Sequence, residues 1–311
     1  MSARDDRVKI CPLCLGEAAP LYRMGAYTVM QCRGCKSGFA DPMPDSSALE
    51  SFYQGFHPNL KAEAVMGRLD LAGALFGYLG MKPDGSRTFL DVGGGNGLFA
   101  KAFEVLGYGT STYVDIDEVA CRFVRNDLGI RSVRVCDVRE LDVGYAEAFD
   151  LIYSRHLVEH LTDPLGFITK LASFRKPGGM LVVQCPNGDS LEYLPYFYSN
   201  VRDRFRKIRQ ATGWSKGRLL RCWLGGGMLH GIDPPRHLWA FSQNGMRKWA
   251  AREGLPIRIF TRNLAYLPFS PGYFRRANRK ERTCDFIGRH LFARLRGGTH
   301  LILMFQEPHE N

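Results

Sequence analysis

The sequence predicts an α/β fold in which helices cover both faces of a parallel sheet, preceded by a small metal-binding module. Short apolar runs alternate with helical segments from Thr88 to Phe305, at the spacing of strand–helix–strand units. Two Cys-x-x-Cys pairs lie near the N-terminus, before this alternation begins. We therefore divide the chain into a cysteine module (residues 1–42), a helical connector (43–86) and an α/β domain (87–311).

The elements of the α/β domain follow from local signals. Strands are expected where apolar residues run together, and helices where apolar residues recur every three or four positions and end at glycine. The expected strands are Thr88–Val92, Ser111–Asp115, Ser132–Cys136, Phe149–Tyr153, Gly179–Cys185, Pro256–Thr261 and Thr299–Phe305. The expected helices are Leu98–Leu106, Glu118–Leu128, Pro164–Phe174 and a segment from the N-cap Ser242 to Glu253.

Composition and charge narrow the class of protein. The chain has 311 residues, of which 45% are hydrophobic and 23% charged, as in ordinary globular domains. It has no apolar run of about 18 residues that would cross a membrane, and its first residues lack the apolar core of a secretory signal. We therefore expect a cytoplasmic protein. The net charge of +11 is concentrated in residues 201–221 and 275–296, which predicts a surface for an anionic partner.

The two cysteine pairs have the spacing of a four-cysteine zinc site, with 17 residues between the pairs. The four residues are Cys11, Cys14, Cys32 and Cys35. Two cysteines three apart on a tight turn can reach one tetrahedral ion, and four thiolates close its coordination sphere. The pattern predicts a zinc-ribbon-like module around structural zinc; the alternative is a redox-active pair. Gly16 and Gly34 are expected to free the backbone of the two turns.

A glycine-rich turn follows the first strand of the α/β domain, and acidic residues end the next two strands. The turn reads G-x-G-x-G from Gly93, and Leu98 stands where a dinucleotide site would need its third glycine. Ligands of such folds bind at the carboxyl ends of strands. Asp115, followed by Ile116, can accept hydrogen bonds from both hydroxyls of a ribose. Its alternative role is a helix cap, which we assign to Asp117.

The third strand ends at Asp137 and Val138, where a carboxylate can take the amino group of an adenine and Val138 can supply apolar contact. The motifs LDVGGGNG, YVDID, CDV and FDLIYSRHLVEHLTDP resemble those of class I S-adenosylmethionine-dependent methyltransferases, within residues 86–185. The likeness is greatest to the small-molecule group that includes ubiquinone-biosynthesis O-methyltransferases. It implies a Rossmann-like sheet of seven strands, with THLILMF resembling the final, antiparallel strand.

The resemblance also implies the parts of the cofactor site. Three glycines would hold the methionine part of S-adenosylmethionine, Asp91 would lie near its amino group, and Ser154 with the two residues after it would line the sulfonium. Asp115 would hold the ribose and Asp137 the adenine. The three glycines are Gly93, Gly95 and Gly97.

A methyltransferase behind a Cys-x-x-Cys ribbon also resembles the sugar C-methyltransferases of antibiotic pathways. Those enzymes have a further C-terminal domain, whereas this sequence stops shortly after Phe305. This departure counts against sugar C-methylation, whereas the likeness in the ribbon linkage stands.

Methyl transfer to a hydroxyl needs a base, and three histidines are candidates. His156 and His160, with Glu159, follow the fourth strand, the two histidines at helical spacing, and His237 lies in Pro-Pro-Arg-His. Histidine titrates near neutral pH, which suits a base. The alternative is that these side chains only pack in the core or cap a helix. No H-E-x-x-H pattern places a metal on them. Cys185 stands where RNA cytosine-C5 methyltransferases carry a nucleophile, but Ser154 and its neighbours replace their second cysteine motif.

Residues 190–235 form an aromatic and basic insert that can cover the acceptor mouth. Aromatic rings and basic side chains together are suited to an anionic membrane surface, which the chain would contact through residues 191–221 and 275–296. The alternatives are that the insert binds nucleic acid or that it is a solvated lid. We predict methylation of a small acceptor that is anionic, glycan-related or lipid-linked, with O-methylation favoured. The alternative functions are an RNA methyltransferase and a non-catalytic S-adenosylmethionine-binding regulator.

Overall fold

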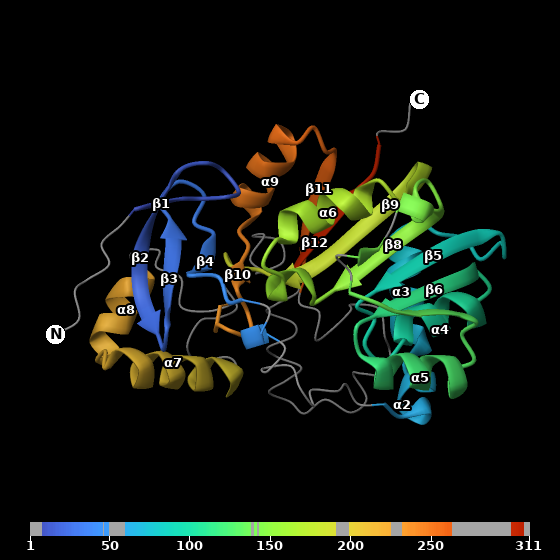
Figure 1. The fold of residues 1–311 in the computed structure, drawn as a ribbon, viewed down its shortest axis with the longest axis horizontal. Coiled ribbons are helices and arrows are strands. Elements are labelled where there is room, and N and C mark those ends of the chain that lie inside the picture. The colour runs from blue at the N-terminus through green and yellow to red at the C-terminus, as the bar shows by residue number, and fades with distance from the viewer. Residues whose placement is uncertain are drawn as a thin grey trace.

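The protein consists of a small N-terminal sheet beside a larger, helix-covered sheet (Figure 1). The computed structural model describes residues 8–45, 47–49, 60–137, 140–141, 143–190, 199–224, 232–262 and 300–307. Among these residues no helix is long and apolar enough to cross a membrane.

The larger sheet has seven strands in the order β11-β12-β9-β8-β5-β6-β7. Its strands are β5 (Arg87–Val92), β6 (Gly109–Asp115), β7 (Ser132–Val135), β8 (Phe149–Arg155), β9 (Arg175–Pro186), β11 (Ile257–Arg262) and β12 (His300–Phe305). Strands β5 to β9 pair in parallel, whereas β12 runs antiparallel to both of its neighbours. The predicted α/β class and the antiparallel last strand are therefore confirmed.

Helices cover both faces of this sheet, as expected for parallel strands. These helices are α2 (Ala62–Met66), α3 (Leu69–Tyr78), α4 (Leu98–Val105), α5 (Glu118–Asn126), α6 (Pro164–Ala172) and α9 (Gln243–Arg252). On one face α3, α4 and α5 bury an aromatic core in which Phe76 and Phe103 pack on Phe89 of β5. On the other face α6 and α9 pack against the same strands, with Trp249 meeting Phe305 of β12.

The small sheet has five strands in the order β1-β2-β3-β4-β10. They are β1 (Lys9–Ile10), β2 (Glu17–Met24), β3 (Tyr27–Cys32), β4 (Gly38–Asp41) and β10 (Trp239–Ala240). Strand β10 arrives from late in the chain and pairs antiparallel with β4. The cysteine module thus shares its sheet with a segment that also leads into α9, and the two bury one continuous core.

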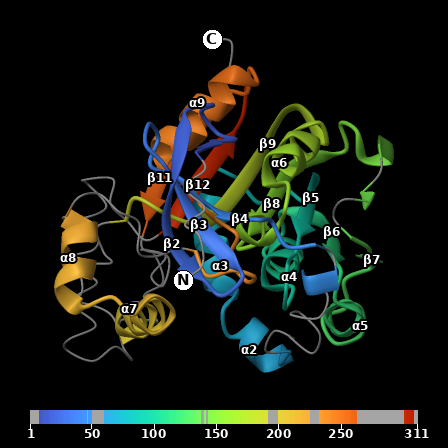
Figure 2. The ribbon, with the colours of Figure 1, turned by 60° about the vertical axis from the view of Figure 1, so that its left-hand side comes forward.

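In its described residues the basic insert forms two helices, α7 (Ser199–Thr212) and α8 (Lys216–Leu224), that lie against the small sheet (Figures 1 and 2). Ile208 and Leu219 are buried in a cluster with Tyr22 and Val29 of that sheet. The described basic side chains of these helices are exposed; they are Arg206, Lys207, Arg209, Lys216, Arg218 and Arg221. The second basic segment, 275–296, lies outside the described residues.

Candidate functional site

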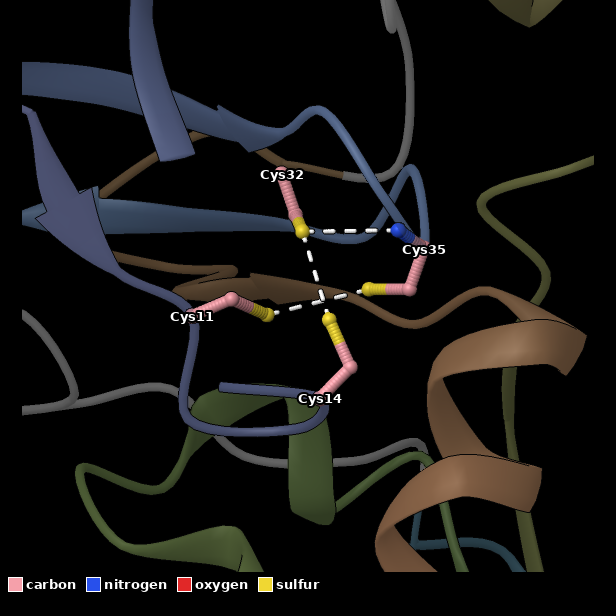
Figure 3. Close-up of side chains that lie close together, drawn as sticks. All are labelled: Cys11, Cys14, Cys32 and Cys35. Atoms are coloured by element: carbon pink, nitrogen blue, oxygen red, sulfur yellow. Dashed lines mark hydrogen bonds between the residues drawn. The ribbon is translucent and has the colours of Figure 1, made fainter. Parts of the chain in front are cut away.

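Four cysteine sulfurs converge at the edge of the small sheet (Figure 3). The Sγ atoms of Cys11 and Cys35 are 3.7 Å apart, and those of Cys14 and Cys32 are 3.4 Å apart. A tetrahedral zinc ion with bonds of about 2.3 Å would hold its sulfurs about 3.8 Å apart. The neighbouring sulfur of Cys35, together with burial, raises the pKa of Cys11, so a cation would replace a proton there. The donor set therefore fits a structural zinc ion.

The two cysteine turns share one backbone geometry, but the glycines do not have the role expected of them. Leu15 and Lys36, each directly after a cysteine pair, adopt the left-handed conformation with φ of 58° and 66°. Gly16 and Gly34 do not; a Cβ on either would lie 3.4 to 4.0 Å from cysteine sulfurs, an ordinary contact. The prediction that these glycines free the backbone was wrong, because the strained position lies one residue before Gly16 and two after Gly34.

A buried pair of serines joins the cysteine module to helix α9. The Ser37 and Ser242 hydroxyls are 2.8 Å apart, and Ser242 Oγ donates to the Cys35 carbonyl at 2.6 Å. Ser242 also caps α9, as predicted, by accepting from Gly245 N at 2.9 Å. At the other end of α9, the Arg252 guanidinium donates to the carbonyls of residues 12 and 13. Helix α9 is thus held by both turns of the cysteine cluster.

The glycine turn lies between β5 and α4, at the carboxyl edge of the larger sheet. Gly93, Gly95 and Gly97 have φ of 65°, 58° and 70°, a region that glycine adopts without strain. A Cβ on Gly93 would come within 2.8 Å of the Leu157 side chain, which follows β8. The turn therefore packs directly against the segment that carries the predicted catalytic histidines.

Asp115 ends β6 and faces this turn. Its Oδ2 accepts from Gly95 N at 3.1 Å and from the Tyr113 hydroxyl at 3.2 Å, and its Oδ1 accepts from Asp117 N at 3.1 Å. Asp117 itself caps α5 through the backbone N–H groups of residues 119 and 120, as predicted. Tyr113 also donates to the Gly95 carbonyl at 2.6 Å. Sequence reasoning missed Tyr113, although its place two residues before Asp115 puts both side chains on one side of the strand.

The remaining predicted cofactor residues lie at the same edge, where β5, β6, β7 and β8 end. Asp91 is 2% exposed and accepts from Ala100 N at 3.1 Å; burial raises the pKa of this carboxyl to about 7. Ile116 is 66% exposed, which is unusual for isoleucine and leaves an apolar surface beside Asp115. Asp137 follows β7. Val138 lies outside the described residues.

Ser154, near the end of β8, supplies a test of whether a cofactor fits here. It pairs with Val92, the residue before the glycine turn. Its hydroxyl is fully buried and has no hydrogen-bond partner within the described part of the chain. Buried hydroxyls are normally bonded, so this atom fits a site that a polar ligand completes. Together with the glycine turn at the same edge of the sheet, it fits the S-adenosylmethionine predicted from the sequence.

The predicted catalytic histidines gather beyond Ser154. His156 has φ of 51°, and its Nδ1 lies 3.0 Å from Oε1 of the fully buried Glu159. His160 is part of a short 3-10 helix, η3 (Val158–His160), and its ring is 4.8 Å from the ring of His237. The structure therefore brings all three histidines together around Glu159, in and beside the segment whose Leu157 contacts the glycine turn.

Cys185 is not placed to act as a nucleophile. The side chain is fully buried in β9, and burial raises the pKa of the thiol well above its ordinary value. A nucleophilic cysteine needs an accessible thiolate. The position therefore fits a packing role, and the structure does not support RNA cytosine-C5 chemistry through Cys185.

Comparison with known proteins identifies the family. Residues 68–258 match the family model described as a methyltransferase domain, and the protein belongs to that family. Among curated relatives, the ubiquinone biosynthesis O-methyltransferase of Parvibaculum lavamentivorans is 29% identical over 34% of this chain and 43% of its own length. That of Xanthomonas euvesicatoria is 30% identical over 41% of this chain and 49% of its own length. The chain thus spans less than half the length of these relatives.

Solved methyltransferase structures are also similar to the chain. A SAM dependent methyltransferase from Archaeoglobus fulgidus is 19% identical, with a TM-score of 0.46 over 85% of this chain and 100% of its own. The 1,6-didemethyltoxoflavin-N1-methyltransferase of Burkholderia thailandensis is 13% identical, with a TM-score of 0.48 over 93% of this chain and 98% of its own.

Proposed function

We propose that the protein transfers a methyl group from S-adenosylmethionine to an oxygen of a small acceptor. The observation that carries the proposal is the contact between the glycine turn and the segment holding His156. A cofactor held by the turn and an acceptor beside that histidine would be neighbours, which is what an in-line methyl transfer requires. The curated relatives are O-methyltransferases, which agrees with an oxygen acceptor.

In this proposal the chain binds the cofactor at four strand ends. The turn that contains Gly93, Gly95 and Gly97 holds its methionine part, Asp91 takes the ammonium group, and Ser154 offers its hydroxyl near the sulfonium. Asp115 accepts from the ribose, Ile116 packs on the adenine, and Asp137 accepts from its amino group, with Val138 alongside. When bound, S-adenosylmethionine supplies an activated methyl group.

His156 is the proposed general base. Glu159 accepts a hydrogen bond from its Nδ1 at 3.0 Å, which leaves Nε2 free to take the proton of an acceptor hydroxyl. The new bond joins the acceptor oxygen to the methyl carbon, and the broken carbon–sulfur bond leaves its electron pair on sulfur. The left-handed φ of His156 is strained for a non-glycine residue and is typical of functional positions.

We also propose that the four cysteines hold structural zinc and that the basic insert helps to bind the acceptor. The sulfur distances support a closed tetrahedral site with no position for substrate. The exposed arginines and lysines of α7 and α8 favour an anionic acceptor, which includes glycan intermediates and lipid-linked metabolites. Contact of 191–221 and 275–296 with an anionic membrane is part of this proposal.

The test is to incubate the protein with methyl-labelled S-adenosylmethionine and a cell extract, and to separate the products by class. We expect label in the metabolite or lipid fraction, and none with the Asp115→Ala variant. Label in nucleic acid would instead support the RNA alternative. Labelling no greater than that of the variant in every fraction, with cofactor binding intact, would contradict catalysis and support a regulatory binder.

The pKa of Asp91 predicts how cofactor binding depends on pH. In the free protein burial raises this pKa to about 7, so the carboxyl holds a proton below that pH. An ammonium group needs the ionised form, so binding must release the proton. We expect the Kd to rise about tenfold per pH unit below 7 and to level off above it. Calorimetry from about pH 5.5 to 8.5 measures this.

The Asp91→Asn variant is the control for this prediction. It keeps an oxygen that can accept from Ala100 N but cannot ionise, so its Kd should be weaker and independent of pH in the same range. An equal slope in the variant would mean that another group causes the pH dependence.

A further inference from the structure

Glu159 is a fully buried carboxylate whose hydrogen bonding is incomplete. Its Oε1 meets His156 Nδ1 at 3.0 Å, but its Oε2 is buried and has no partner among the described residues. An ionised carboxylate is costly to bury unless each oxygen meets a donor or a cation. The second oxygen therefore points to a missing positive ligand.

Two imidazoles stand beside this carboxylate. His160 Nε2 lies 3.9 Å from Glu159 Oε1, while His160 Nδ1 lies 2.7 Å from the Arg236 carbonyl, which can only accept. Nδ1 must then carry the hydrogen, so the lone pair of the neutral ring is on Nε2. The second ring, His237, has its Nδ1 3.4 Å from Asp233 Oδ1. The hydrogen bond of His160 Nδ1 to a backbone oxygen is typical of metal-binding histidines, because it fixes the orientation of the ring.

The two segments that carry these side chains are fastened to each other. Leu238 N donates to the Glu159 carbonyl at 2.8 Å, and the Trp239 indole donates to the Leu161 carbonyl at 2.8 Å. The three side chains are therefore held in place by the backbone of η3 and of residues 233–241.

We propose that Glu159, His160 and His237 bind a divalent transition-metal cation, in a second metal site of different chemistry from the four cysteines. Their ligand atoms all lie within 4.8 Å of one another. A tetrahedral ion with bonds of about 2.0–2.2 Å would draw them to about 3.5 Å apart, so a closure of about 1 Å suffices. Two imidazoles and one carboxylate are the donors that such cations accept. The H-E-x-x-H search could not find this set, because His237 comes from a distant segment.

Three protein ligands leave a coordination position for an outside molecule. In combination with the proposed methyl transfer, on which this step rests, the natural occupant of that position is an oxygen of the acceptor. The cation would hold that oxygen beside His156, which shares Glu159 with the site. Acceptors with two neighbouring oxygens would gain the most affinity, since both oxygens could bind the same cation.

The test is the zinc content of the full chain, measured without S-adenosylmethionine or acceptor. Protein is dialysed against free Zn²⁺ buffered from about 1 nM to 1 µM and then analysed for metal. We expect two zinc ions per wild-type chain, and one in His160→Ala and in His237→Ala. The control His300→Asn also removes a buried imidazole, one that contacts His156 but lies outside the cluster, and should keep two.

One zinc per wild-type chain throughout this range would overturn the proposal, and so would two zinc ions in both histidine variants. Zinc retained by the four cysteines shows that a variant is folded. If a histidine variant loses both ions, Glu159→Gln, which preserves the side-chain volume, decides between the outcomes. Because no methyl transfer is measured, failure here leaves the proposed activity standing, and failure of that activity leaves the zinc count unchanged.

Discussion

Replacing Cys14 by serine should release zinc from the cysteine module and destabilise a region much larger than the module itself. Structural zinc sites contribute of the order of 10 kcal/mol to the folding of small domains. Loss of even about 3 kcal/mol corresponds to a decrease in Tm of about 6–12 °C for a domain of about 150–250 residues. We expect a decrease of at least this size, with loss of one zinc per chain.

The effect should reach helix α9 because the cysteine turns hold both of its ends. Ser242, the N-cap of the helix, bonds to the Cys35 carbonyl, and Arg252 bonds to the carbonyls of residues 12 and 13. A Cβ on Gly245, in the first turn, would lie 3.2 Å from Cys35 Sγ. When the turns open, α9 loses these partners. Amide hydrogen exchange should therefore increase in α9 as well as in β3 and β4.

Cys136→Ser is the matched control, because Cys136 is also partly buried but lies outside the cluster. We expect it to keep its zinc and to change Tm by only a few degrees. If Cys14→Ser behaves in the same way, with zinc retained and α9 protected, then the cysteines do not hold the structural ion that we propose.

The parts of the structure that the sequence predicted are those that depend on neighbouring residues. The strands of the larger sheet are short apolar runs, and the turn after β5 needs three glycines with positive φ. The caps Asp117 and Ser242 each stand directly before a helix. The residues that make up each of these signals lie within a few positions of one another, so each signal can be recognised in a single sequence.

The parts that the sequence did not predict are contacts between distant segments. Strand β10 completes the small sheet from a position near residue 240, and nothing in its two residues indicates that partner. The Ser37–Ser242 bond joins residues 205 positions apart. The meeting of His160 with His237 is of the same kind. The three histidines and Glu159 could be named from the sequence, but the contacts of Glu159 with two of these histidines could not be predicted.

The Asp115→Ala variant should lose most of its affinity for S-adenosylmethionine. The Asp115 carboxylate lies at the end of β6, where we propose that it accepts from the ribose hydroxyls. Hydrogen bonds to a charged group contribute about 1.5–3 kcal/mol each, so the Kd should rise about 10- to 100-fold. The variant also removes the acceptor for Gly95 N and for the Tyr113 hydroxyl, which would loosen the glycine turn and add to the loss. Calorimetry with S-adenosylmethionine measures the Kd of the variant and of the wild type.

The neighbouring Asp117→Ala variant separates cofactor binding from stability. Asp117 caps α5, so its removal should cost about 0.5–2 kcal/mol of folding free energy and leave the Kd within about twofold. Asp115→Asn, which keeps one acceptor oxygen but no charge, should fall between wild type and Asp115→Ala in affinity. Equal losses of affinity in Asp115→Ala and Asp117→Ala would show that the carboxylate at the end of β6 supports the loop alone. The ribose would then need another partner at the carboxyl edge of the sheet.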